Sequence, residues 1–116
     1  MSTTPEGFHM ADIRRKRATP RRAVAVGELH AGPAGFAAIV ARTLPKGDAL
    51  AMAEVAGLQG AKQAAMLMPL CHPLLLEYVD VRCEPVPERR AVRVYCETAL
   101  TARTGVEMEA LAGASA

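Results

Sequence analysis

The chain has 116 residues, about half of them apolar, with no tryptophan and a formal net charge of +2. This length allows one domain with one hydrophobic core. No apolar run approaches the ~20 residues of a membrane span, and the first residues lack the apolar segment of a signal peptide. Three cysteines without CxxC or Cys/His metal spacing favour neither a disulfide framework nor a metal site. We therefore expect a cytoplasmic protein that binds no membrane and no structural metal.

The first 22 residues differ in charge from the rest of the chain. They carry six basic and two acidic residues, a net charge of +4, which leaves −2 for residues 23–116. We expect an extended basic arm over residues 1–22 and a single domain over residues 23–116. Such an arm is either a solvated tail or a contact for an anion. Aromatic residues do not interleave with the bases, as single-strand binding would favour, so we expect no nucleic-acid partner.

The following elements are predicted in chain order from hydrophobic periodicity and turn residues. Alternating β-branched residues predict a strand over 23–29, and a proline at the first helical position predicts a short helix over 33–43. Asp48 is a good N-cap for a long helix over 49–67, which ends before Pro69. Period-two patterns predict strands over 79–84 and 92–98, joined by a hairpin loop at 85–90. A loop at 101–105 leads into a helix that begins at residue 106.

The order of these elements predicts an α+β fold with an antiparallel sheet. The long helix contains a stripe of small residues at helical spacing: Ala53, Gly57, Ala61 and Ala64, with Gly60 beside them. Because each interior glycine costs a helix about 1 kcal/mol relative to alanine, two of them require a structural reason. We expect this stripe to let the sheet or another helix approach closely.

Two places in the predicted loops could carry acid–base chemistry. The first is Cys71-His72, which lies between Pro69 and Pro73. An imidazole held between prolines suits proton transfer, although a polar loop residue explains the same pattern. The second is Glu107-Met108-Glu109 at the start of the last helix. Acidic residues there either line a site or only complement the helix dipole.

A third place could bind an anion. Lys46 comes just before the N-terminus of the long helix, where free backbone N–H groups favour negative charge. A solvated turn explains this residue equally well, and the sequence contains no P-loop and no dinucleotide-binding motif. From the residues alone, we expect a small α+β domain that binds a phosphorylated ligand.

Several of these segments together resemble the cyclic pyranopterin monophosphate synthase family of molybdenum-cofactor biosynthesis. The two most distinctive strings are PLCHPL at 69–74 and TGVEMEAL at 104–111. KGDAL at 46–50, AGLQGAK at 56–62 and an N-terminal pattern of Met10, Asp12, Lys16, Thr19, Arg21 and Ala23 agree with them. The resemblance runs from about Met10 to the last residue.

The resemblance implies a ferredoxin-like fold, with helices on one face of the sheet, and a lyase activity. The family converts 3′,8-cyclo-7,8-dihydroguanosine 5′-triphosphate to cyclic pyranopterin monophosphate and releases pyrophosphate. By resemblance, the catalytic residues are Lys46, His72, Glu107 and Glu109. The residues that contact the substrate are then Leu70, Cys71, His72, Met108 and Glu109, together with Lys62, Lys16 and Arg21. The family has no tightly bound cofactor, magnesium often assists, and the subunits form hexamers of dimers that share their sites.

Two departures from the family pattern bear on activity. The family continues its last helix through an aspartate and a lysine and then adds a strand, and the sequence stops at Ala116 before these residues. We therefore expect an incomplete last helix and strand. Arg14 also stands where the family commonly has serine, which makes the arm more basic.

Three functions remain open at this point. The first is the synthase itself, and the second is a catalytically dead homologue that keeps substrate binding or subunit assembly. The third is a nucleic-acid-binding module that uses residues 14–22. It predicts affinity for any polyanion with steep salt dependence, whereas the first two predict a preference for a purine triphosphate.

Overall fold

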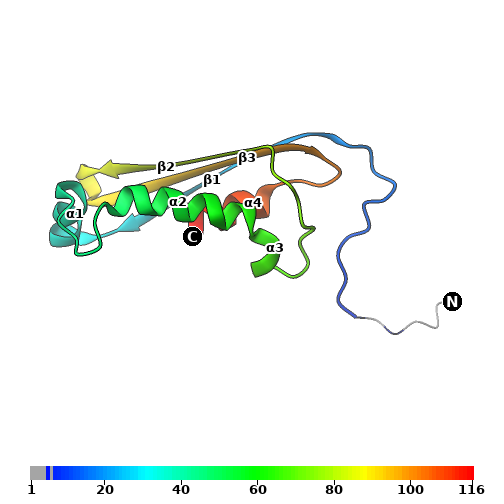
Figure 1. The fold of residues 1–116 in the computed structure, drawn as a ribbon, viewed down its shortest axis with the longest axis horizontal. Coiled ribbons are helices and arrows are strands. Elements are labelled where there is room, and N and C mark those ends of the chain that lie inside the picture. The colour runs from blue at the N-terminus through cyan, green and yellow to red at the C-terminus, as the bar shows by residue number, and fades with distance from the viewer. Residues whose placement is uncertain (1–4, 6) are drawn as a thin grey trace.

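The computed structural model describes residue 5 and residues 7–116 (Figure 1). Residues 1–4 and 6, which belong to the expected arm, lie outside the described residues. In chain order, the elements are β1 (Thr19–His30), α1 (Gly32–Ala41), α2 (Ala49–Lys62), α3 (Ala64–Leu67), β2 (Tyr78–Val86), the 3-10 helix η1 (Pro87–Arg89), β3 (Ala91–Ala102) and α4 (Glu107–Ser115). None of the helices in the described part is long and apolar enough to span a membrane.

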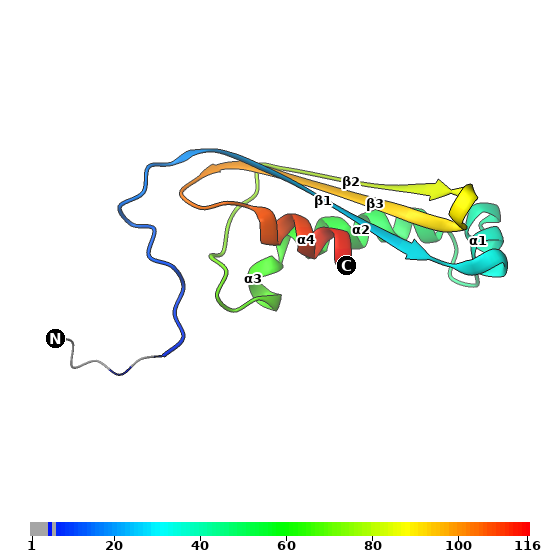
Figure 2. The same ribbon diagram turned by 180° about the vertical axis from the view of Figure 1, so that it is seen from behind.

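The strands form an antiparallel sheet in the order β1-β3-β2, with β3 in the centre. Helices α2 and α4 lie next to each other against one face of this sheet, and the opposite face is open (Figures 1 and 2). Helix α2 packs against β2, and α4 packs against β1 and β3. The predicted α+β fold with an antiparallel sheet and helices on one face is confirmed.

The central strand shows the predicted alternation between the two faces. Cys96 and Thr98 are fully buried under the helices. Glu97 lies on the open face and forms an ion pair of 2.8 Å with Arg22 of β1. The core contains small and medium side chains, as the low aromatic content predicts, and the largest fully buried one is Val106.

Glycines allow α2 and α4 to approach closely. A Cβ atom on Gly57 would lie 2.7 Å from Cγ1 of Val81 in β2 and 3.0 Å from the Gly113 carbonyl oxygen in α4. A Cβ atom on Gly60 would lie 3.0 Å from the Ala112 carbonyl oxygen. The expected close approach is therefore found on both sides, toward the sheet and toward another helix. Ala53, the first residue of the predicted stripe, is exposed and lies outside this contact.

Several boundaries differ from the sequence predictions; β3, for example, continues to Ala102 instead of ending at residue 98. Strand β1 begins at Thr19, four residues before the predicted start, because residues 19–22 pair with residues 99–102 of β3. The single helix predicted over 49–67 is wrong. Helix α2 ends at Lys62, Gln63 has φ −113° and ψ 21°, and a separate turn, α3, follows. Asp48 is the N-cap of α2, as predicted, and accepts hydrogen bonds from the N–H groups of Leu50 and Ala51.

The two edges of the sheet differ. On β2, the backbone N–H of Cys83 points away from β3 and donates a hydrogen bond of 3.0 Å to the Glu54 carboxylate of α2. Pro85 follows on the same strand and has no N–H group. On the other edge, no strand in the described part of the chain pairs with the outer side of β1, and Val24 and Val26 are about half exposed.

Candidate functional site

The site is built around the N-terminus of α4. The hydroxyl of Thr98 in β3 donates a hydrogen bond of 3.1 Å to the carbonyl of Val106, which fixes the start of the helix to the sheet. The Glu107 carboxylate folds back against Gly105, in the space that a side chain at position 105 would occupy. A glycine at position 105 is therefore required for this orientation of Glu107.

Glu109 is the buried acid of the site, with a relative exposure of only 5%. Burial raises the pKa of its carboxyl group, and the negative charge of Glu107 raises the pKa further. A backbone hydrogen bond and the nearby His72 partly offset this shift. Glu107 itself is exposed. The first turn of α4 therefore presents two carboxyl groups in different environments, one exposed and one buried.

Cys71 and His72 approach this helix from the loop between α3 and β2. Both side chains are partly buried. Burial raises the pKa of the Cys71 thiol, and the charge of Glu109 adds to the shift. The His72 ring nitrogen Nε2 lies 2.7 Å from the carbonyl oxygen of Ala11, a residue of the arm. Cys71 and His72 therefore lie in a loop near the first turn of α4, close enough for Cys71 and His72 to interact electrostatically with Glu109.

A cavity of about 450 Å³ adjoins the buried acid. Glu109 lies in its wall with Lys62 at the end of α2, and the loop residues Pro73 and Leu74 complete part of the lining. A carboxyl group with a raised pKa and a lysine therefore line the same cavity. This combination can donate a proton and neutralise an anion.

Lys46 does not join this cluster within one chain. It precedes α2, whereas Lys62 is the last residue of that helix. At 1.5 Å per residue, the 14 residues of α2 span about 21 Å, so the two lysines lie at opposite ends of the helix. Figure 1 shows the same separation, with the start of α2 near α1 and its end near α3. Lys46 therefore does not line the cavity of Glu109 and Lys62 within one chain.

The arm residues lie at two different places. Lys16 is exposed, and its backbone N–H donates to the Ile13 carbonyl at 3.1 Å. Arg21 lies in β1 and lines a second cavity, of about 420 Å³, with Glu77 and Thr101. Within the described residues, the Arg21 Nε atom is buried and has no hydrogen-bond partner. Arg21 is therefore available to an anion, but in a cavity distinct from that of Glu109.

The last two predicted contact residues are exposed apolar side chains. Leu70 is 50% exposed on the loop, and Met108 is 41% exposed on α4. Each lies next in sequence to a residue of the acidic cluster or its loop. Among the described residues, no group of three or more His, Cys, Asp or Glu side chains could hold a metal ion.

The sequence analysis missed three residues that hold the cluster in place. Gly105 and Thr98 orient the start of α4, and Ala11 contacts His72 through its backbone. The TGVEMEAL string contains Gly105, so the glycine before the acids was a usable signal. A backbone carbonyl that acts across 61 positions has no signature in the sequence.

Comparison with known proteins places these residues in one family. The MoaC family matches residues 10–116. The cyclic pyranopterin monophosphate synthase of Herpetosiphon aurantiacus is 46% identical over 107 residues, and that of Rhodospirillum rubrum is 48% identical over 102 residues. A molybdenum cofactor biosynthesis bifunctional protein of Synechococcus elongatus is 45% identical over 107 residues.

These alignments cover most of the chain but less of each relative. They include 92% of the chain with Herpetosiphon and Synechococcus and 88% with Rhodospirillum. The chain spans 65% of the Herpetosiphon protein, 61% of the Rhodospirillum protein and 34% of the bifunctional protein. The match extends over both distinctive strings and the cluster that they form. The chain belongs to the MoaC family.

Proposed function

We propose that the chain is a cytoplasmic lyase that converts 3′,8-cyclo-7,8-dihydroguanosine 5′-triphosphate to cyclic pyranopterin monophosphate and pyrophosphate. The observation that carries this proposal is the buried Glu109, which lines the Lys62 cavity and interacts electrostatically with His72 and Glu107, on the two strings most typical of the family. Relatives at 46–48% identity bear the name of this synthase.

The cationic side chains would bind the triphosphate. Lys62 faces the cavity of Glu109 and would neutralise a phosphate group there. Arg21 and Lys16 would be further phosphate contacts. Arg21 is the better supported of the two, because its Nε atom is buried and has no hydrogen-bond partner among the described residues. Lys46 would come from a second subunit, because about 21 Å of helix separates it from Lys62 in its own chain. The proposal therefore includes a homo-oligomer, in the family a hexamer of dimers.

The carboxyl groups and the imidazole would handle protons. The raised pKa of Glu109 favours its protonated form, which suits a proton donor. The exposed Glu107 is suited to act as an acceptor or to orient a polar group of the substrate. His72 would exchange protons with the reacting purine-derived ring. Leu70, Cys71 and Met108 would contact the substrate beside these groups.

Magnesium assistance stays a prediction. The described residues offer no group of three metal-binding side chains, so they do not fit a resident metal site. A magnesium ion would have to arrive on the triphosphate oxygens, which are the hard ligands that this ion prefers.

A second candidate function is a homologue that binds the substrate or assembles with other subunits without turnover. The sequence analysis left this alternative open, and binding of the cyclic triphosphate without turnover would distinguish it from the synthase.

The test is pyrophosphate release from the cyclic triphosphate by the purified chain. A matched version carries the C-terminal segment of the Herpetosiphon relative. Release by either version that is abolished by His72→Ala supports the synthase. Binding of the triphosphate without release, even in the extended version, supports the second function. Equal affinity for any polyanion, with steep salt dependence, would refute both and support nucleic-acid binding.

A further inference from the structure

In the part of the arm that the structure describes, the backbone of Ala11 contacts His72. The carbonyl oxygen of Ala11 lies 2.7 Å from Nε2 of His72, a short distance for a hydrogen bond between nitrogen and oxygen. A carbonyl group has no proton to donate. The proton of this bond must therefore be on Nε2, and in a neutral imidazole the other nitrogen, Nδ1, then carries the free lone pair.

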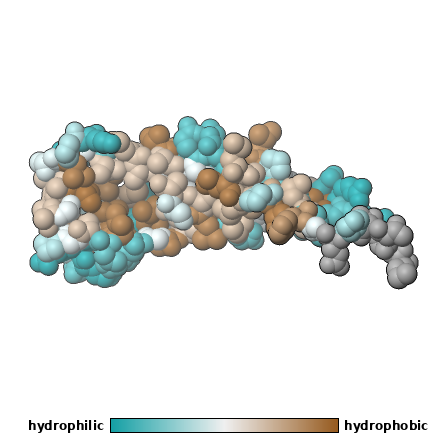
Figure 3. Space-filling view, turned by 90° about the horizontal axis from the view of Figure 1, so that it is seen from below, coloured by the Kyte–Doolittle hydropathy of each residue, from teal (hydrophilic) through white to brown (hydrophobic). Residues whose placement is uncertain are grey.

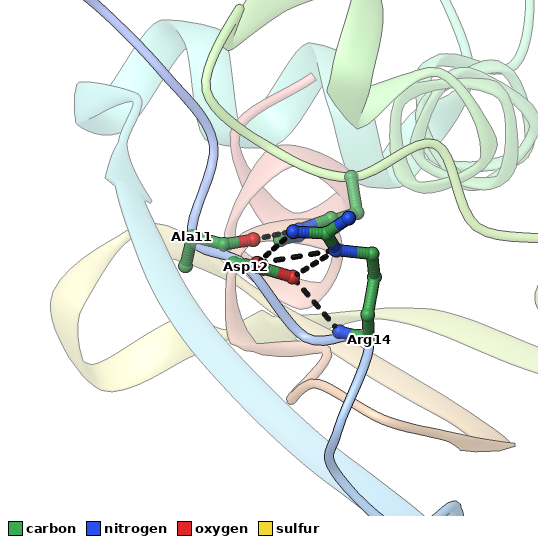
Figure 4. Close-up of polar contacts among 4 residues, drawn as sticks. Ala11, Asp12 and Arg14 are labelled. Carbon is green, nitrogen blue, oxygen red and sulfur yellow. Dashed lines mark hydrogen bonds and ion pairs between the residues drawn. The ribbon is translucent and has the colours of Figure 1, made fainter.

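A compact turn directly after Ala11 fixes this carbonyl. The Asp12 carboxylate accepts a hydrogen bond of 3.1 Å from the backbone N–H of Arg14. It also accepts hydrogen bonds from the Arg14 guanidinium, at 2.7 Å to Nη2 and 3.0 Å to Nε. The Lys16 N–H donates to the Ile13 carbonyl at 3.1 Å and closes the turn. Figure 4 shows the Asp12 carboxylate enclosed by Arg14, with the Ala11 carbonyl beside it.

The carboxylate of Asp12 has two kinds of partner with different consequences. Both members of its ion pair with Arg14 are exposed, with side-chain exposures of 87% for Arg14 and 59% for Asp12. Water and salt screen such a pair, so the charge contributes little stability. The hydrogen bond to the Arg14 backbone is different, because it restricts the main chain at the residues that follow Ala11. An uncharged acceptor at position 12 can make the same bond.

We propose that Asp12 is a positioning residue for His72. Through the turn, it holds the Ala11 carbonyl against Nε2 and keeps the imidazole in the tautomer that leaves Nδ1 free to accept a proton. The catalytic use of Nδ1 rests on the proposed function above. The tautomer itself does not, because it follows from the arm and the loop in the absence of substrate.

The experiment measures the tautomer directly in the full chain labelled with ¹⁵N-histidine. Long-range proton–nitrogen correlation spectra are recorded at about pH 8.5, above the ordinary imidazole range. His72→Gln assigns the signals against those of His9 and His30. In the unmodified chain, the expected result is a protonated Nε2 and an unprotonated Nδ1 with well-separated shifts. In Asp12→Ala, the two shifts should move toward each other as the tautomers mix.

Asp12→Asn is the matched control. Its amide oxygen can still accept the Arg14 backbone N–H, so the separated shifts should return although the charge is lost. A protonated Nδ1 in the unmodified chain, or unchanged shifts in Asp12→Ala, would overturn the proposal. If the ¹⁵N shifts of Nδ1 and Nε2 also move toward each other in Asp12→Asn, Asp12 acts through its charge and not through its hydrogen bond to the Arg14 backbone. Fixed shifts, together with no pyrophosphate release by either the chain or its extended version, would refute the proposed function and leave this inference intact.

Discussion

A methyl group at Gly57 would enter the contact that joins α2 to both the sheet and α4. The added Cβ would lie 2.7 Å from Cγ1 and 3.1 Å from Cγ2 of Val81, and 3.0 Å from the Gly113 carbonyl oxygen. Val81 is a core residue, and the carbonyl belongs to the backbone of α4. Neither neighbour can move away without disturbing the packing that holds the site, so we predict that Gly57→Ala destabilises the fold.

The magnitude follows from two opposing effects. Overpacking a filled core costs about 1–3 kcal/mol, whereas replacing an interior helical glycine by alanine returns about 1 kcal/mol of helix propensity. Because the backbone carbonyl is one of the crowded atoms, we expect a net loss of about 1–2 kcal/mol. Gly35 in α1 is the matched control. Its Cβ would meet only the Ala31 methyl, at an ordinary 3.5 Å, so Gly35→Ala should stabilise the chain by up to about 1 kcal/mol.

The assay is urea unfolding followed by circular dichroism, with both variants and the unmodified chain at the same protein concentration. At roughly 4–8 °C per kcal/mol for a domain of this size, thermal scans should show Tm shifts of opposite sign. Val81→Ala in the Gly57→Ala background should recover part of the loss, since it removes two of the three crowded contacts. If Gly57→Ala stabilised the chain as much as Gly35→Ala does, the inferred close packing of α2 would be refuted.

Three further predictions concern charge, chemistry and assembly. Because folding raises the pKa of Glu109, the unfolding free energy should fall as the pH rises from the ordinary carboxyl pKa to the raised one, and it should stay low above that. In urea titrations, Glu109→Gln should make the unfolding free energy less dependent on pH and should be more stable than the unmodified chain at about pH 8. An unchanged pH dependence in Glu109→Gln would contradict the burial of the charge. His72→Ala should keep the circular dichroism spectrum and the oligomeric state while abolishing pyrophosphate release; loss of assembly together with activity would favour a structural loop instead. The helix-covered face carries apolar groups over much of its surface (Figure 3), including Met66 at 83% and Leu67 at 67% exposure, so sedimentation should show a multimer, and a stable monomer at micromolar concentration would argue against family-like assembly.

Patterns among neighbouring residues were sufficient to predict most of the fold from the sequence. The period-two alternation of β2 and β3, the Asp48 cap and the small-residue stripe all depend on neighbouring residues, and they were predicted from the sequence. The start of β1 could not be predicted in this way. Residues 19–22 (TPRR) show no alternation of apolar and polar side chains, and they are extended because they pair with residues 99–102 of the long strand β3. The break at Gln63 has no glycine or proline to mark it, and it coincides with the burial of Ala64 against the rest of the fold.

The candidate site could also be predicted only in part from the sequence. The residue types of the cluster were evident from the two strings, but the difference between Glu107 and Glu109 depends on burial, which a three-residue stretch does not reveal. The separation of Lys46 from Lys62 follows from the length of the helix between them, and could have been worked out from the predicted element alone. The contact of Ala11 with His72 needed the three-dimensional path of the arm.

The two edge strands of the sheet, β1 and β2, differ in how readily a further strand could pair with them. At β2, the Glu54 carboxylate already takes the Cys83 N–H, and Pro85 offers no donor, so an incoming strand would meet a negative charge and a missing hydrogen bond. Strand β1 is long and regular, and two of its valines, Val24 and Val26, are about half exposed. An additional strand would therefore meet fewer obstacles beside β1 than beside β2. The valines at that edge, Val24 and Val26, are the positions where a lysine would most directly block such an addition.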